Sequence, residues 1–215
     1  MVRIESVNVG RARGMPNYEG PTGIFKAPAV GPVTLGLEGL AGDYIADTKH
    51  HGGPDQAVYL YFADDYAWWE KKLGRALTPG TFGDNLTLSE IASADLAVGD
   101  RLVAGDVVLE VTAPRIPCNT LARRMQDSGF VRAFRDAERP GAYCRVVVTG
   151  SVAAGLAVTH QRYAGPRVGV VDMFHDNFIV KTLDPSRIRA VLAAPIAIRE
   201  RRNWEAFLAA AEAKA

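Results

Sequence analysis

Short hydrophobic runs separated by glycine and proline make up most of the chain up to about residue 160. Short runs rich in β-branched and aromatic side chains are typical of β-strands. Residues 104–106, Ala-Gly-Asp, predict a tight turn that joins two strands as a hairpin. The pattern predicts strands at residues 2–9, 33–37, 57–62, 99–103, 107–112, 143–149 and 152–158.

Three stretches between these runs favour helices. The first follows residue 62, where Asp64 or Asp65 is placed to accept hydrogen bonds from the free amides of the first turn. Gly74 is placed to end this helix. The other two helices are expected at residues 120–126 and 131–137.

Beyond about residue 165, hydrophobic residues recur at helical spacing. Pro195 ends the second of three such stripes. The stripes are Val170, Val171 and Phe174; Ile188, Val191 and Leu192; and Trp204, Phe207, Leu208 and Ala211. We therefore expect a strand-rich domain over residues 1–165 and a three-helix tail over residues 166–215.

Many short strands with glycine and proline turns favour a mainly β fold, a closed or nearly closed β-barrel with a small C-terminal helical unit. The regular alternation of strands and helices that marks a doubly wound sheet is missing. Gly36, Gly39 and Gly42 do not form the GxGxxG fingerprint, and no Walker-type GxxxxGK is present. The sequence thus offers no recognisable nucleotide-binding loop.

Composition narrows the class of protein. A chain of 215 residues with 48% hydrophobic content can bury a core without disulfides, and its net charge of +1 does not favour nucleic acid or anionic membranes. We find no signal-peptide pattern and no apolar stretch near the roughly 18–20 residues of a membrane span, so we expect a cytoplasmic protein. Two cysteines cannot hold an iron–sulfur cluster, which generally needs four ligands.

A first polar cluster lies in the stretch Lys-His-His-Gly-Gly. Lys49, His50 and His51 are cationic or can become so, and Gly52 and Gly53 let the backbone approach a ligand. Together they would favour a phosphate group. A polar turn with incidental histidines is an equally good interpretation of the spacing.

Asn85 belongs to a second motif, FGDNLT. Its amide offers both donors and an acceptor, which suits the edge of a heterocycle. Taken alone, this motif is better explained as a turn that enters a strand.

The third motif contains Cys118. Two prolines stiffen residues 114–119, so the thiol is expected to be held rigidly at the end of a strand. Arg115, Arg123 and Arg124 are expected to lower its pKa, and a thiolate is a soft, strong metal ligand.

Three alternatives bear on this cysteine. A buried inert thiol is the usual one, and we accept it for Cys144, which lies inside an expected strand. A Cys–His hydrolase would need Cys118 beside a histidine that a third group orients, and the sequence leaves this open. A zinc site lacks the usual ligand spacing among its candidates, which are His50, His51, Cys118, His160 and His175.

The motifs KHHGGPDQAV, FGDNLT, VGDRL and PRIPC follow one another in this order. The ordered series resembles the MOSC domain, and within that family the stand-alone bacterial YiiM group, which carries a small helical tail. The resemblance covers roughly residues 20–160 by motif and the tail by general character. Each motif is weak alone, and their order makes the resemblance specific.

The resemblance implies a β-barrel-like MOSC fold and a molybdopterin-type molybdenum cofactor, which is labile, so that recombinant protein can be purified without it. Cys118 matches the family's cysteine, which ligates the metal or handles sulfur. The stretch 49–53 matches a segment near the cofactor's phosphate end, and Asn85 and Arg115 match positions that line the same pocket. Thr120 stands where related sequences often have a lysine, so no lysine role is assigned there.

The resemblance further implies a reductase that removes oxygen from small N-hydroxylated compounds such as hydroxylaminopurines. The chain shows no flavin or nicotinamide site, so electrons would come from a separate donor protein. A histidine near Cys118 is expected to deliver protons. Two other classes stay open, a sulfur carrier or cofactor-handling protein with a Cys118 persulfide and an oxyanion-sensing module. The tail would cover one end of the barrel, form a lid or make a homodimer contact.

Overall fold

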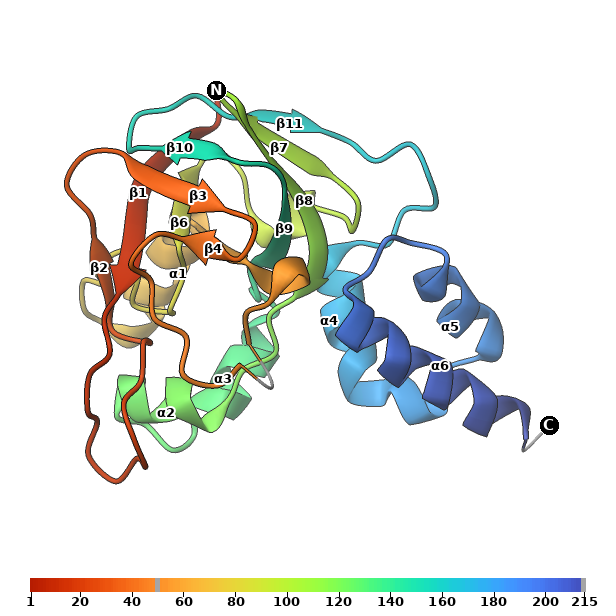
Figure 1. Ribbon diagram of the computed structural model, residues 1–215. Coiled ribbons are helices and arrows are strands. Elements are labelled where there is room, and N and C mark those ends of the chain that lie inside the picture. Colours follow the sequence, from red (N-terminus) through yellow and green to blue (C-terminus); the bar gives the residue numbers. More distant parts are fainter. Residues whose placement is uncertain (49–50, 214–215) are drawn as a thin grey trace.

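The computed structural model describes residues 1–48 and 51–213 and contains two sheets (Figure 1). The larger sheet has eight strands in the order β11-β7-β8-β9-β5-β6-β1-β2, and the smaller has the order β10-β3-β4. All pairings are antiparallel except that of β5 with β6. The strands are β1 (Arg3–Gly10), β2 (Lys26–Pro28), β3 (Val33–Gly36), β4 (Gly39–Leu40), β5 (Val58–Phe62), β6 (Leu86–Ser89), β7 (Arg101–Ala104), β8 (Val107–Pro114), β9 (Ala142–Val148), β10 (Gly150–Val152) and β11 (Thr159–Gln161).

The eight-stranded sheet is open at the level of strand pairing. Its edge strands β2 and β11 do not pair with each other in the described part of the chain. The residues just before β11 reach β1 only through an isolated bridge between Arg3 and Ala157 and backbone hydrogen bonds such as Ile4 N to Leu156 O. The expected closed barrel is therefore not confirmed, and the fold is a mixed, sheet-rich α/β arrangement.

The helices lie where the sequence predicts them. Gly74 ends α1 in the left-handed conformation, with a φ of 66°. The predicted cap of this helix is wrong, because Phe62 occupies the N-cap position and Asp65 instead accepts a hydrogen bond from Ser93 Oγ. The helices are α1 (Ala63–Leu73), α2 (Asn119–Met125), α3 (Phe130–Ala137), α4 (Val170–Ile179), α5 (Pro185–Leu192) and α6 (Ile198–Glu212), with short 3-10 turns η1 (Pro54–Gln56), η2 (Ser93–Asp95) and η3 (Val180–Thr182).

One predicted strand is largely wrong. The expected run at residues 152–158 is divided between the end of β10 and a non-strand segment that precedes β11. Its apolar residues still contribute to the core, since Val152 and Val158 are buried. The hydrophobic pattern identified burial correctly, but a turn at Gly155, whose φ is 89°, interrupts the strand.

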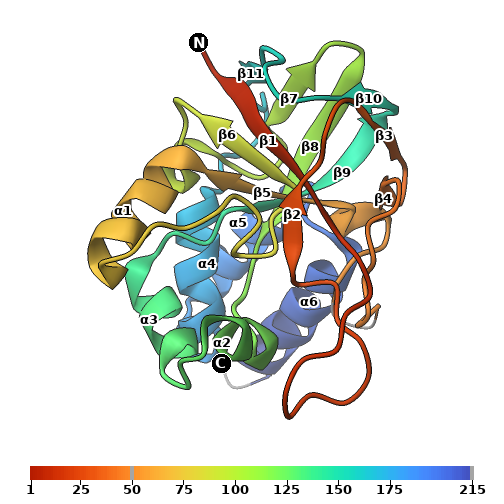
Figure 2. The same ribbon diagram turned by 90° about the vertical axis from the view of Figure 1, so that its left-hand side faces the viewer.

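Helix α4 connects the three hydrophobic clusters of the molecule. Val170 belongs to the cluster between the strands, and Phe174 belongs to an aromatic cluster around Trp69 that lies under α1, α2 and α3. Met173 belongs to the cluster of the helical tail, which centres on Trp204. Helices α1 to α4 gather on one side of the strands in Figure 2. The tail thus shares a helix with the rest of the core.

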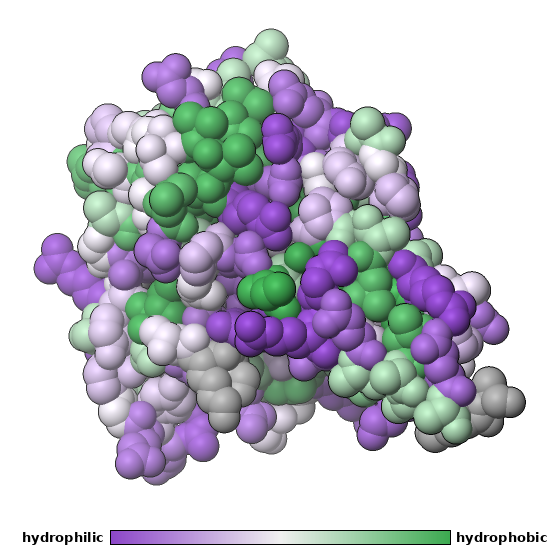
Figure 3. Space-filling view, turned by 45° about the vertical axis from the view of Figure 1, so that its right-hand side comes forward, coloured by the Kyte–Doolittle hydropathy of each residue, from purple (hydrophilic) through white to green (hydrophobic). Residues whose placement is uncertain are grey.

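Polar contacts also fasten the tail to the strand-rich part. Asp55 in η1 forms an ion pair with Arg145 of β9 at 3.0 Å and accepts a hydrogen bond from the backbone N of Ile198 at 2.7 Å. Arg199 donates to Gln56 Oε1 at 2.8 Å. On the face shown in Figure 3, polar side chains lie between hydrophobic patches. None of the helices in the described residues is long and apolar enough to span a membrane.

Candidate functional site

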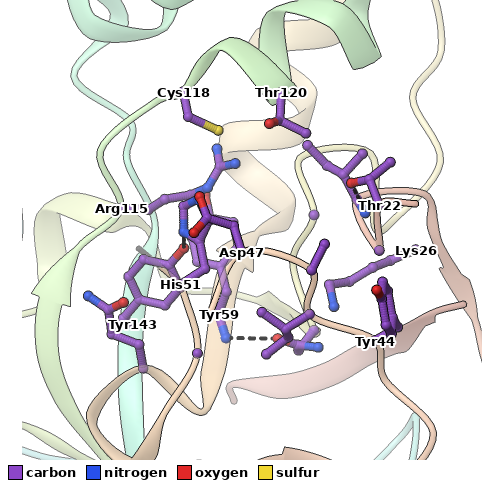
Figure 4. A pocket seen from close by; sticks show the side chains of 18 of the residues that line it. Thr22, Lys26, Tyr44, Asp47, His51, Tyr59, Arg115, Cys118, Thr120 and Tyr143 are labelled. Carbon is purple, nitrogen blue, oxygen red and sulfur yellow. Dashed lines mark hydrogen bonds between the residues drawn. The ribbon is translucent and has the colours of Figure 1, made fainter. Parts of the chain in front are cut away.

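A pocket lies beside the N-terminal end of α2, where the end of β8, the start of β5 and two loops meet (Figure 4). The loops are those that precede β2 and η1. Its polar and charged lining includes Thr22, Lys26, Tyr44, Asp47, His51, Gln56, Tyr59, Asn85, Arg115, Cys118, Thr120 and Tyr143. Segments far apart in the sequence therefore supply one site.

Cys118 is held where β8 leads into α2, and it is the N-cap residue of that helix. Burial by itself would raise the pKa of the thiol. A hydrogen bond from His51, the positive charge of Arg115 and the backbone N–H of Leu121 outweigh burial and lower the pKa of Cys118 from 9.0 to about 6. At neutral pH the sulfur is therefore mainly a thiolate.

Arg115 lies beneath this sulfur and is almost completely buried, with 4% of its surface exposed. Its guanidinium lies 5.2 Å from the centroid of the Tyr59 ring. Burial disfavours the charge, but the nearby Tyr59, Cys118 and Tyr143 groups raise the pKa of Arg115 above its usual value. Its Nη1 atom is buried and has no hydrogen-bond partner among the described residues.

His51 is oriented by Tyr143. The hydroxyl of Tyr143 lies 3.0 Å from His51 Nδ1. If the hydroxyl donates to Nδ1, the other ring nitrogen carries the proton and can donate to the thiolate. Burial raises the pKa of Tyr143, although Arg115 opposes this, so Tyr143 stays a neutral donor. The arrangement is a cysteine beside a histidine that a third group orients.

A second polar group forms the other wall of the pocket. Lys26 pairs with Asp43, and burial lowers the pKa of the lysine although Asp43 opposes the shift. Asn85 Nδ2 donates to Asp43 Oδ2 at 2.9 Å, and Asn85 Oδ1 accepts from the backbone N of Tyr59 at 3.1 Å. The amide of Asn85 thus makes hydrogen bonds within the protein while it lines the pocket, and its predicted contact with a heterocycle stays a prediction.

The predicted glycine-rich loop lies only partly within the described residues. Lys49 and His50 fall outside them, so their predicted role is not addressed. His51 and Gly52 line the pocket, and the φ of Gly52 is 71°. Gly53, with a φ of 79°, is the N-cap residue of η1 and is not among the lining residues.

Three further predictions concern the arginines Arg123 and Arg124, the second cysteine Cys144 and a zinc site. The side chains that chiefly lower the pKa of Cys118 are His51 and Arg115, and the predicted Arg123 and Arg124 are not among the leading causes. Cys144 is fully buried in β9, and burial raises its pKa. No group of three or more His, Cys, Asp or Glu side chains that could hold a metal ion occurs in the described residues, which do not include the zinc candidate His50.

Sequence reasoning missed part of the site. Thr22 and Lys26 come from a loop that carried no recognised motif, and Tyr143 appeared only as the start of a strand. The one available signal was a lysine in the run Gly-Ile-Phe-Lys, an unusual place for a charge that is now seen to be buried.

Known proteins resemble this chain in sequence and in fold. The family model described as MOSC domain matches residues 47–159, which include His51, Arg115 and Cys118. The chain is 37% identical to the uncharacterized protein YflK of Bacillus subtilis over 153 residues, 70% of this chain and 69% of that protein. It is 28% identical to protein YiiM of Escherichia coli over 151 residues, 69% of this chain and 67% of that protein.

A third relative is a protein named reductase from Gibberella moniliformis. It is 30% identical over 177 residues, which are 78% of this chain but only 30% of the relative. Among solved structures, YiiM from Geobacillus stearothermophilus superimposes with a TM-score of 0.81 at 24% identity, covering 97% of this chain and 100% of that one. The structure of YiiM from Escherichia coli gives a TM-score of 0.77 at 20% identity, covering 97% of this chain and 93% of that one.

Proposed function

Since the chain belongs to the MOSC domain family and is YiiM-like, we propose that it binds a molybdenum cofactor in this pocket and reduces small N-hydroxylated compounds there. The MOSC domain is associated with molybdenum cofactors in general, and a reductase is among the relatives. The observation that carries the proposal is the thiolate of Cys118, held above the buried charge of Arg115.

The side chains of the pocket fit such a cofactor. A thiolate is a soft ligand that suits a metal of this kind. The unpartnered Nη1 of Arg115 is a buried donor that calls for an acceptor, and a pyranopterin offers carbonyl and ring nitrogen acceptors. Cys118 would hold the metal and Arg115 would donate to the pterin, while His51 and Gly52 would line the same pocket.

The reaction consumes two electrons and two protons. R–NHOH becomes R–NH2 and water, as the N–O bond breaks and its oxygen leaves as water. When bound, the cofactor supplies the centre that exchanges electrons and accepts oxygen. His51 lies next to Cys118 and can pass a proton to the departing oxygen, with Tyr143 holding its ring in place. The electrons come from a separate donor protein in this proposal.

The test is elemental analysis for molybdenum on protein made in a host that synthesises the cofactor. We expect near-stoichiometric metal in the wild type and in Cys144→Ala, and its loss in Cys118→Ser. Reduction of a hydroxylaminopurine with a chemically reduced viologen as donor should follow the same pattern. Wild-type protein without molybdenum, or Cys118→Ser protein that keeps it, would contradict the proposal.

A sulfur carrier is a second candidate, favoured by the same low thiol pKa, because a thiolate is also what accepts a sulfur atom. In that case Cys118 would carry a persulfide. Mass analysis after mild alkylation would find one additional sulfur on Cys118 and no molybdenum. Bound molybdenum with an unmodified Cys118 favours the reductase.

A further inference from the structure

Arginines from separate segments of the chain lie close to one aromatic ring, that of Phe25, beside the pocket. The guanidinium of Arg13 lies 4.6 Å from the centroid of the Phe25 ring, and that of Arg124 lies 4.8 Å from the same centroid. Arg75 follows directly after Gly74, the residue that ends α1. Burial and the charges of Arg13 and Arg75 lower the pKa of Arg124, as expected for like charges in close proximity.

No carboxylate of the described residues forms an ion pair with any of these three arginines. The Nε atom of Arg124 is buried and lacks a hydrogen-bond partner within the same part of the chain. Arg139, which is also partly buried, has Asp65 as its acidic partner. Like charges without a counter-charge are unfavourable, so a bound anion would stabilise this cluster.

The cluster borders the proposed active site. Thr120 and Arg124 are four residues apart on α2, and residues at this spacing lie on one face about 6 Å apart along the axis. Thr120 lines the pocket, as do Ile24 and Lys26 on either side of Phe25. Figure 2 shows α2 close to the loop that connects β1 with β2, which carries Arg13 and Phe25.

We propose that Arg13 and Arg124 bind a phosphate monoester at the rim of the pocket. Guanidinium groups recognise phosphate oxygens with paired, charge-assisted hydrogen bonds, and several arginines can share one phosphate. Arg13 is exposed, so the phosphate approaches from solvent. The phosphate belongs either to a substrate nucleotide whose base enters the pocket or to the terminal phosphate of the pterin cofactor. The phosphate site itself does not depend on the proposed function. Only the identity of the molecule that carries the phosphate, nucleotide or cofactor, rests on it.

Binding is tested first on cofactor-free protein, by calorimetric titration with inorganic phosphate, adenosine 5′-monophosphate and adenosine. The double variant Arg13→Gln, Arg124→Gln should bind the two phosphate compounds about tenfold more weakly than the wild type. The control Arg132→Gln removes an exposed arginine from α3 and should bind like the wild type. A wild type that binds neither phosphate compound, or a double variant with unchanged affinity, overturns the proposal.

A second measurement identifies the carrier of the phosphate. The double variant is produced in a host that makes the cofactor, and its molybdenum content is compared with that of the wild type. Loss of molybdenum assigns the site to the cofactor. Unchanged molybdenum, with a raised KM for a nucleotide substrate and an unchanged KM for the free base, assigns it to the substrate. Wild-type protein without molybdenum contradicts the proposed function but leaves the phosphate titration intact.

Discussion

The two cysteines of this chain have opposite acidities because their surroundings differ. Cys144 is enclosed by the sheet, where burial disfavours a thiolate and raises its pKa. Cys118 is also largely removed from water, yet the His51 hydrogen bond and the Arg115 charge favour its thiolate. Residue type alone therefore does not determine reactivity, since each pKa depends on which groups the fold brings to the sulfur.

Alkylation of cofactor-free protein should reveal this difference. We expect the rate at Cys118 to rise with pH to a plateau with a midpoint near its pKa of about 6, while Cys144 stays unmodified. Because the His51 hydrogen bond is the largest favourable effect, His51→Ala, which leaves no side-chain donor, should move the midpoint upward and slow alkylation at pH 6 about tenfold. Mass spectrometry of timed samples gives both rates. An unchanged midpoint in His51→Ala would show that Arg115 and the backbone N–H of Leu121 set the acidity without His51.

At the scale of elements, the short turn η1 connects the site with the tail. It follows the pocket loop that carries His51. Its Asp55 forms an ion pair with Arg145 of β9 and accepts a hydrogen bond from the first backbone N–H of α6. Arg199 adds a second connection, to Gln56, which lines the pocket. The start of α6 thus holds in place the segment next to the proposed active site.

Replacing Asp55 with alanine removes the ion-pair partner of Arg145 and the hydrogen-bond acceptor of the Ile198 backbone N–H. We expect Asp55→Ala to lower the free energy of unfolding by about 1–3 kcal/mol, the range for losing a hydrogen bond to a charged group. Urea unfolding followed by circular dichroism measures this change. Asp106→Ala, in the exposed turn between β7 and β8, is the matched control and should be neutral. Equal stability of Asp55→Ala and the wild type would mean that the contact contributes nothing.

At the scale of the whole molecule, the three hydrophobic clusters are not independent. Helix α4 contributes one residue to each cluster: Val170 packs among the strands, Met173 in the tail and Phe174 in the aromatic cluster. A helix that is shared by all clusters couples their unfolding. The division into a strand-rich domain (residues 1–165) and a helical tail (166–215) therefore stays a prediction. It does not require that the two parts unfold separately.

We expect one cooperative thermal transition. The three tryptophans allow this to be measured, since Trp204 reports on the tail and Trp68 and Trp69 report on the aromatic cluster. Fluorescence melting of Trp204→Phe, and of the double variant Trp68→Phe, Trp69→Phe, should each coincide with its own circular dichroism curve. Phe174→Ala should lower stability by about 3–5 kcal/mol and keep a single transition. A fluorescence midpoint that differs from the circular dichroism midpoint of the same variant would refute the coupling.

Much of the local structure could be predicted from the sequence. Helix α1 ends at Gly74 as expected, and β8, α2 and α3 lie at the predicted positions. These features depend on neighbours within a few residues, so side-chain periodicity and glycine carry enough information. The cap by Asp65 failed because a distant partner, Ser93, competes for the carboxylate.

The sequence alone determined that Cys118 follows a stiff segment next to Arg115, and that the ordered motifs belong to a MOSC-type chain. Only the tertiary structure decided that His51 and Tyr143 reach the thiol, that Lys26 joins the pocket and that Arg13 meets Arg124. The physical reason is the separation along the chain between the groups that produce each feature. Hydrophobic period and turn chemistry act between near neighbours, whereas a pKa or a binding pocket is produced by groups that only the folded chain brings together.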